Sequence, residues 1–76
     1  MKIDNLLQQV FPESDFDPND PELGIGAFPE WDSLANFNLL MLIEETYSVR
    51  FSVDDMAELK TLFEIKERLK NFGVRT

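Results

Sequence analysis

The side chain that best matches a chemical role is the hydroxyl of Ser33, which follows Asp32 and precedes a segment rich in Leu and Met. A serine hydrolase needs a His base and a glycine elbow around its nucleophile, whereas this chain has no His and no such elbow. Ser and Asp are also common helix caps, so the structural role of the pair is to start a helix. A hydroxyl at a helix start after a long loop is accessible. This arrangement favours a serine that is modified by the active site of another protein.

The absence of Cys and His excludes further chemistry from the whole chain. Disulfides, Cys nucleophiles and the thiolate and imidazole ligands of zinc sites all need one of these residue types. We therefore expect a protein that is not an enzyme. Its 76 residues predict one small domain, residues 1–76, because so short a chain buries only about 60–65% of its unfolded surface.

The segment before Ser33 has the composition of a calcium-binding loop, with acidic residues at four positions: Asp15, Asp17, Asp20 and Glu22. Carboxylate oxygens are ligands that calcium prefers. An EF-hand loop that starts at Asp15 requires Gly at its sixth position and Glu at its twelfth, where this chain has Asp20 and Gly26. We therefore predict a solvated acidic loop without a metal site. A role as an acidic cation buffer would need a tight site that this spacing does not provide.

The charge of the chain limits its partners. The formal net charge is −8, with 15 acidic and 7 basic residues, and a surface of this sign repels nucleic acids and anionic membranes. Residues 1–59 carry the excess, with 13 acidic residues against 2 basic ones, while residues 60–76 have a net charge of +3. We therefore expect basic protein surfaces as partners. No apolar run approaches the ~20 residues of a membrane span and the first residues lack a signal-peptide pattern, so we expect a soluble, monomeric, cytoplasmic protein.

The hydrophobic periodicity predicts an all-α fold, a small bundle of three main helices and one short helix. The predicted helices cover residues 2–11, 34–47, 53–58 and 62–71. The predicted caps are Asp32 or Ser33, Ser52 paired with Asp55, and Thr61 paired with Glu64, with Gly73 ending the last helix. The buried stripe predicted for the last helix is Leu62, Ile65, Leu69 and Phe72.

A loop over residues 12–32 separates the first two predicted helices. It contains all four prolines, two of the three glycines and seven acidic residues. A loop of this length is unusual in a small domain unless it carries function or is packed by its own side chains. Apolar residues for such packing are present at five positions: Phe16, Leu23, Ile25, Phe28 and Trp31.

The helix predicted over residues 34–47 carries two apolar stripes about 140° apart. One stripe contains Leu39, Leu40, Ile43 and Tyr47, and the other contains Leu34, Phe37 and Met41. The second stripe is flanked by Asn38, Glu44 and Glu45, as expected of a docking surface with an apolar centre and a polar rim. The alternative is a central helix that buries both stripes, and the sequence favours neither.

The spacing of these residues resembles that of the acyl carrier proteins. The resemblance is carried by Asp32-Ser33-Leu34 at a helix start, then by residues 39–45 and 47, and further on by Phe51, Asp54, Asp55, Leu59 and Thr61. It covers about half of the chain, from Ser33 to Leu69, whereas the first helix and the loop match that family only in kind.

The resemblance implies that a separate phosphopantetheinyl transferase attaches a 4′-phosphopantetheine arm from coenzyme A to Ser33. The thiol of this arm would hold an acyl group as a thioester, in a chain that has no thiol of its own. Asp32 would assist attachment by orienting the transferase and its metal. The helix over residues 34–47 would be read by acyl-loading and acyl-processing enzymes with basic surfaces, which makes Leu34, Phe37, Met41, Glu44 and Glu45 the predicted docking residues.

Two departures from the pattern indicate a specialised carrier. Glu30 stands where the family usually has Gly, with the bulky Trp31 between it and Asp32. Residues 35–38 read Ala-Asn-Phe-Asn where housekeeping fatty-acid carriers tend to have acidic residues. We therefore predict a freestanding carrier in a specialised fatty acid or polyketide pathway. The alternative is a helical adaptor of the same fold that is never modified and acts only by binding proteins.

Overall fold

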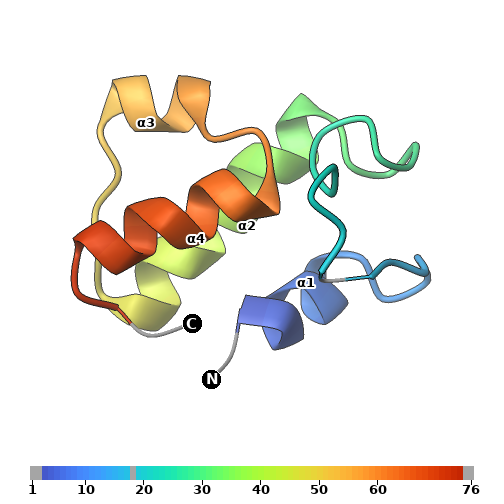
Figure 1. Ribbon diagram of the computed structural model, residues 1–76, viewed down its shortest axis with the longest axis horizontal. Coiled ribbons are helices and arrows are strands. Elements are labelled where there is room, and N and C mark those ends of the chain that lie inside the picture. Colours follow the sequence, from blue (N-terminus) through green and yellow to red (C-terminus); the bar gives the residue numbers. More distant parts are fainter. Residues whose placement is uncertain (1–2, 18, 75–76) are drawn as a thin grey trace.

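The chain folds into four α-helices in a computed structural model that describes residues 3–17 and 19–74. The helices are α1 (Ile3–Val10), α2 (Ser33–Tyr47), α3 (Val53–Glu58) and α4 (Leu62–Asn71), as Figure 1 shows. The described residues form no β-strand, so the predicted all-α architecture, with a long loop between the first two helices, is confirmed. Lys2, the first residue of the predicted 2–11 helix, lies outside the described residues.

Capping residues start the helices as the sequence predicts. Asp32 caps α2, because one carboxylate oxygen accepts a hydrogen bond of 2.8 Å from the backbone N–H of Ala35. Ser33 is therefore the first helical residue and not the cap. Reciprocal capping boxes start α3, where Ser52 pairs with Asp55, and α4, where Thr61 pairs with Glu64.

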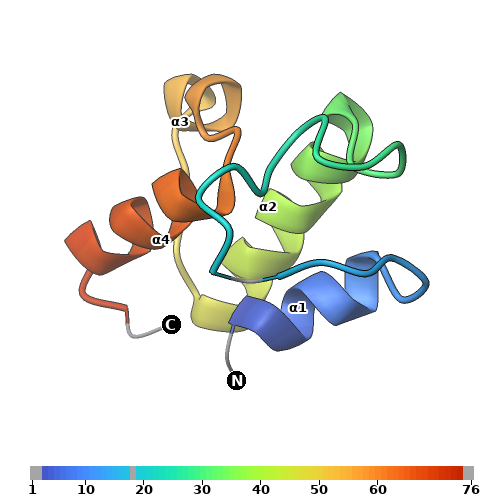
Figure 2. The same cartoon turned by 45° about the vertical axis from the view of Figure 1, so that its right-hand side comes forward.

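The core lies between α1, α2 and α4. α1 packs against α2 (Figure 2), and both helices bury their apolar stripes almost completely. The buried side chains include Ile3, Leu6 and Leu7 from α1, Leu39, Leu40 and Ile43 from α2, and Leu62, Ile65 and Leu69 from α4. Phe72 does not belong to this core, although it was predicted to. It follows the end of α4 and is 43% exposed, because the chain leaves the helix there and turns at Gly73, where φ is +81°.

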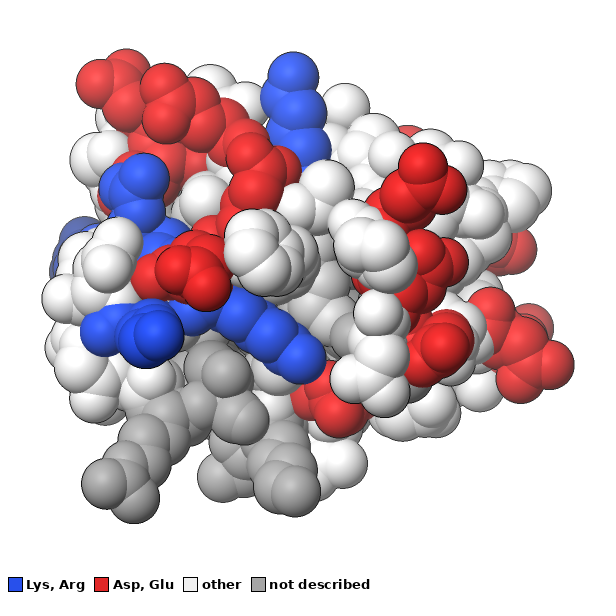
Figure 3. Space-filling model, viewed as in Figure 1, with Lys and Arg blue, Asp and Glu red and all other residues white. Residues whose placement is uncertain are grey.

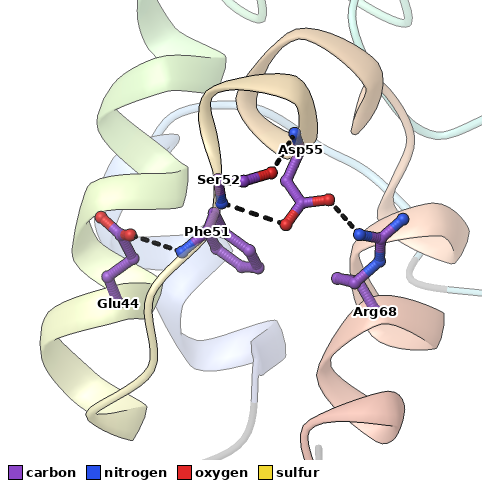
Figure 4. A network of polar contacts seen from close by, with 5 residues as sticks. All are labelled: Glu44, Phe51, Ser52, Asp55 and Arg68. Atoms are coloured by element: carbon purple, nitrogen blue, oxygen red, sulfur yellow. Dashed lines mark hydrogen bonds and ion pairs between the residues drawn. The ribbon is translucent and has the colours of Figure 1, made fainter.

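α3 lies at the opposite end of the molecule from α1 and is joined to its neighbours by polar contacts (Figures 1 and 4). The largely buried carboxylate of Asp55 accepts hydrogen bonds from the backbone N–H of Ser52 and from the guanidinium of Arg68 on α4. Glu44 on α2 accepts a hydrogen bond of 2.7 Å from the backbone N–H of Phe51, in the segment that leads to α3. Side chains of α2 and α4 therefore hold both α3 and the segment that leads to it in place.

Aromatic side chains pack the long loop against the end of α1. The ring of Phe28 lies edge-on to Phe11 at 5.0 Å between centroids, and Phe11 stacks on Trp31 at 5.1 Å. Phe16 stacks on Phe28 at 6.3 Å. Leu23 and Trp31 are buried, whereas Ile25 is 37% exposed, so the predicted packing holds for the loop residues other than Ile25.

The described part of the chain is compact, with a radius of gyration of 11.3 Å, close to the roughly 11 Å expected for this length. None of its helices is long and apolar enough to cross a membrane. At the far end of α2 from Ser33, burial and the nearby Asp4 carboxylate raise the pKa of Tyr47 above its ordinary value.

Candidate functional site

The candidate site is the start of α2, where Ser33 is exposed to solvent. Asp32 immediately before it has extended backbone geometry, with φ −99° and ψ −173°, which turns the chain from the loop into the helix. Because Asp32 makes the capping hydrogen bond, the helix start does not depend on the Ser33 hydroxyl. That hydroxyl therefore lies on the surface at the N-terminal end of a helix of 15 residues.

Two buried side chains hold the start of α2 in place from its buried side. Trp31 is 1% exposed, and its indole N–H donates a hydrogen bond of 2.9 Å to the side-chain oxygen of Asn36. The side-chain amide of Asn36 donates a hydrogen bond of 2.8 Å to the backbone carbonyl of Leu59. The loop before Ser33, the first turn of α2 and the segment after α3 thus meet at Asn36. The bulk of Trp31 belongs to the core and not to the exposed surface at Ser33.

Sequence reasoning did not identify Asn36 as a site residue, although a signal was present. Asn36 precedes Leu39 and Leu40 by three and four positions, which places it on the same helix face as the buried stripe. A polar residue on a buried face needs hydrogen-bond partners, so its position already indicated a buried contact.

A short backbone pairing joins the loop to the segment between α3 and α4. Ile25 N–H donates to the carbonyl of Lys60 at 2.9 Å, and Leu62 N–H donates to the carbonyl of Leu23 at 2.8 Å. Gly24 lies between these bonds opposite Thr61, and a Cβ atom on Gly24 would lie 2.3 Å from the Lys60 carbonyl oxygen. Only glycine allows so close an approach of the two backbones.

An open depression lies beside Ser33, and we call it the loop groove. It is lined by residues 25–29 and 31–33 and has a volume of about 480 Å³. The walls come from the end of the long loop, and Asp32 and Ser33 form the side next to α2.

The second apolar stripe of α2 is exposed on the same helix as Ser33. The exposed fractions of Leu34, Phe37 and Met41 are 69%, 47% and 49%, whereas Leu39, Leu40 and Ile43 are completely buried. The alternative of a central helix that buries both stripes is therefore wrong. Leu42, which lies on neither stripe, is partly buried against the core.

The two predicted rim carboxylates differ in their surroundings. Glu45 is exposed, whereas Glu44 is half-buried and bonded to the Phe51 N–H. Figure 3 shows acidic side chains over α3 and along the loop side of the molecule, and basic side chains over α4. Across residues 3–17 and 19–74, no three acidic side chains gather into a group that could hold a metal ion.

Comparisons with known proteins identify no family for this chain. The chain matches no protein-family model, and searches of curated proteins and of solved structures find no significant match.

Proposed function

We propose that the chain is an acyl carrier protein, which carries a 4′-phosphopantetheine arm on Ser33 and holds acyl intermediates as thioesters in a specialised biosynthetic pathway. The observation that carries the proposal is the surface position of the Ser33 hydroxyl, with the capping function taken over by Asp32. A serine presented in this way is accessible to the active site of another protein. The exposed stripe of Leu34, Phe37 and Met41 on the same helix supports a docking surface beside the modified residue.

The residues at the site are compatible with a 4′-phosphopantetheine group on Ser33. The N-terminal end of α2 favours a phosphate on Ser33, since the first N–H groups of a helix lack acceptors within it and carry a partial positive charge. In the attachment step, the Ser33 oxygen forms a bond to phosphorus and the pyrophosphate bond of coenzyme A breaks. Adenosine bisphosphate leaves, and the hydroxyl proton passes to a base of the transferase. The arm then supplies the thiol that this chain lacks.

The first test is modification of Ser33. Incubation with coenzyme A, magnesium and a permissive phosphopantetheinyl transferase should raise the intact mass by one phosphopantetheinyl group. The Ser33→Ala variant should stay unmodified and keep its helical circular dichroism. Its stability should change by no more than about 0.5 kcal/mol, because Ser33 is exposed and Asp32 still caps the helix. Modification that persists in this variant would overturn the assignment, and a wild-type chain that stays unmodified would favour the adaptor alternative.

The Asp32→Asn variant separates capping from assistance in attachment. Asn caps a helix about as well as Asp, so this variant should keep the stability of the wild type. It removes the negative charge beside Ser33, and we expect slower modification if that charge orients the transferase and its metal. Equal modification rates for the two proteins would restrict Asp32 to the structural role.

A further inference from the structure

The loop groove begins at the proposed attachment residue. Ser33 and Asp32 form one side of it, and the rest of its lining comes from residues 25–29 and 31. A group tethered to Ser33 by a flexible arm reaches the groove when the arm folds back over the helix start. The groove is therefore within reach of such a group.

The walls of the groove are mostly apolar and are held in place. Ile25, Ala27 and Pro29 are exposed apolar residues of the lining. Three backbone hydrogen bonds fix this turn: Gly26 N–H to the Trp31 carbonyl at 3.0 Å, Ala27 N–H to the Gly24 carbonyl at 2.9 Å, and Trp31 N–H to the Phe28 carbonyl at 3.1 Å. A ligand that enters the groove therefore does not have to order the loop.

Aromatic contacts add rigidity from beneath the turn. The half-buried ring of Phe28 lies 5.0 Å from Phe11 and 5.9 Å from Trp31, measured between ring centroids. Phe28 is the aromatic residue of the lining that keeps exposed surface, since Trp31 is 1% exposed. An aromatic ring contacts flat or compact apolar groups in stacked or edge-on geometry. The lining includes one carboxylate, that of Asp32 beside Ser33, so a negatively charged ligand is disfavoured there.

The core offers a less favourable place for the same group. Leu39, Leu40, Ile43, Ile65 and Leu69 are completely buried in the described structure. An acyl group entering among them would have to displace side chains from a packed interior, which costs free energy. The groove takes up a group without this displacement.

We propose that the loop groove binds the acyl cargo of the arm on Ser33, and that it selects neutral, compact apolar acyl groups, aromatic ones above all. This inference rests on the proposed function. Tethering by a short flexible linker produces an effective concentration on the order of 1 mM. The groove is therefore occupied for about half of the time if it binds the free acyl group with a Kd of about 1 mM.

The first experiment uses the unmodified protein and a free probe. Isotope-labelled protein is titrated with S-benzoyl-N-acetylcysteamine, and amide chemical shifts are followed by NMR. We expect saturable shifts at residues 25–33 and at the Trp31 indole N–H, with a Kd of about 1 mM. The corresponding succinyl thioester, which carries a carboxylate, should bind at least about tenfold more weakly. Shifts that do not saturate below about 10 mM, or that centre on the buried stripe of α2, would overturn the proposal.

A pair of variants controls for general effects of added charge. Ala27→Asp places a carboxylate on the wall of the groove, whereas Val53→Asp places one on a side chain of α3 that is 86% exposed. We expect the benzoyl-induced shifts to disappear in the first variant and to remain in the second. Circular dichroism establishes that both variants are folded. Equal binding by the two variants contradicts a site in the groove.

The second experiment loads Ser33 itself with benzoyl-phosphopantetheine from the matching coenzyme A thioester. The loaded protein should show the same shifts at residues 25–33 as the titration. Loading without these shifts overturns the inference and leaves the carrier function standing. Saturable binding of the free probe without any modification of Ser33 overturns the carrier function and leaves the groove as a binding site for apolar acyl groups.

Discussion

Two nearly buried side chains, Trp31 and Asn36, determine how Ser33 is presented. Trp31 ends the loop and Asn36 lies in the first turn of α2, and the hydrogen bond between them spans Ser33 in the sequence. Asn36 also binds the carbonyl of Leu59, so its amide group uses both its oxygen and its nitrogen. Loss of this amide would leave the Trp31 indole N–H and the Leu59 carbonyl buried without partners.

We predict that Asn36→Leu lowers the free energy of unfolding by about 1–3 kcal/mol, because unsatisfied buried polar groups carry a desolvation cost of this size. The measurement is urea denaturation followed by circular dichroism. Asn38→Leu is the matched control, since Asn38 is exposed two residues further along the same helix. Equal stability of the two variants would show that the amide of Asn36 does not support the helix start.

Sequence reasoning identified Ser33 and Asp32 but left open which of them caps α2. Both residue types are good caps, and only the backbone geometry decides between them. The prediction for Trp31 was incomplete for a similar reason. Its bulk was visible in the sequence, whereas its burial depends on Phe11 and Asn36, which come from two different helices or their ends.

One face of α2 is buried in the core, whereas its other face carries an exposed apolar stripe. Helical spacing predicted the two stripes, and their burial shows that one belongs to the core while the other remains at the surface. Spacing alone could not determine this, because a helix covered on both sides has the same pattern. The deciding fact is the placement of the other helices: α1 packs against α2 and leaves Leu34, Phe37 and Met41 uncovered.

Substitutions on the two faces of α2 should therefore have different effects. Ile43→Ala should cost about 2–5 kcal/mol of stability, since it removes a completely buried side chain. Met41→Ala should change stability by less than about 0.5 kcal/mol, because Met41 is 49% exposed. It should instead weaken transferase binding by about 1–2 kcal/mol if the exposed stripe is an interface anchor. Chemical denaturation and modification kinetics, measured on both variants, make the comparison. Equal modification kinetics for Met41→Ala and the wild type would contradict the docking role.

The excess of acidic residues opposes folding. The net charge of −8 is spread over a protein with a radius of gyration of 11.3 Å, so like charges lie close together in the folded state. The sequence alone predicted this imbalance, because charge counting needs no structure. The position of the charges does need one, as the ion pair between the largely buried Asp55 and the partly exposed Arg68 shows.

Added salt should therefore raise the melting temperature in a graded way. A screening gain of about 1 kcal/mol corresponds to a rise of about 4–8 °C for a domain of this size. The control is the double variant Glu13→Gln with Asp15→Asn, which removes two exposed charges from the loop and should show a weaker response. Thermal unfolding across a salt series provides the measurement. A sharp, stoichiometric transition with micromolar calcium would support the metal site that the loop spacing argues against.

The backbone pairing of Leu23–Ile25 with Lys60–Leu62 is the part of the fold that could not be predicted from the sequence. Backbone hydrogen bonds between segments so far apart leave no local pattern, and Gly24 looks like an ordinary loop glycine until its distance to Lys60 is known. The loop therefore was predicted as a loop, while its attachment to the segment between α3 and α4 was not.

This attachment of the loop also determines the order of folding events. The loop before Ser33 cannot take its final shape until residues 60–62 are in place, and closing so long a stretch of chain is slower than forming a helix. Trp31 is the single tryptophan of the chain and is buried by this loop and α2. In refolding experiments, its fluorescence should therefore change after the helical signal has formed. A nascent chain that ends before Leu62 would display Ser33 without its native setting, so under the proposed function the transferase meets the presented serine only after residues 60–62 have been synthesised.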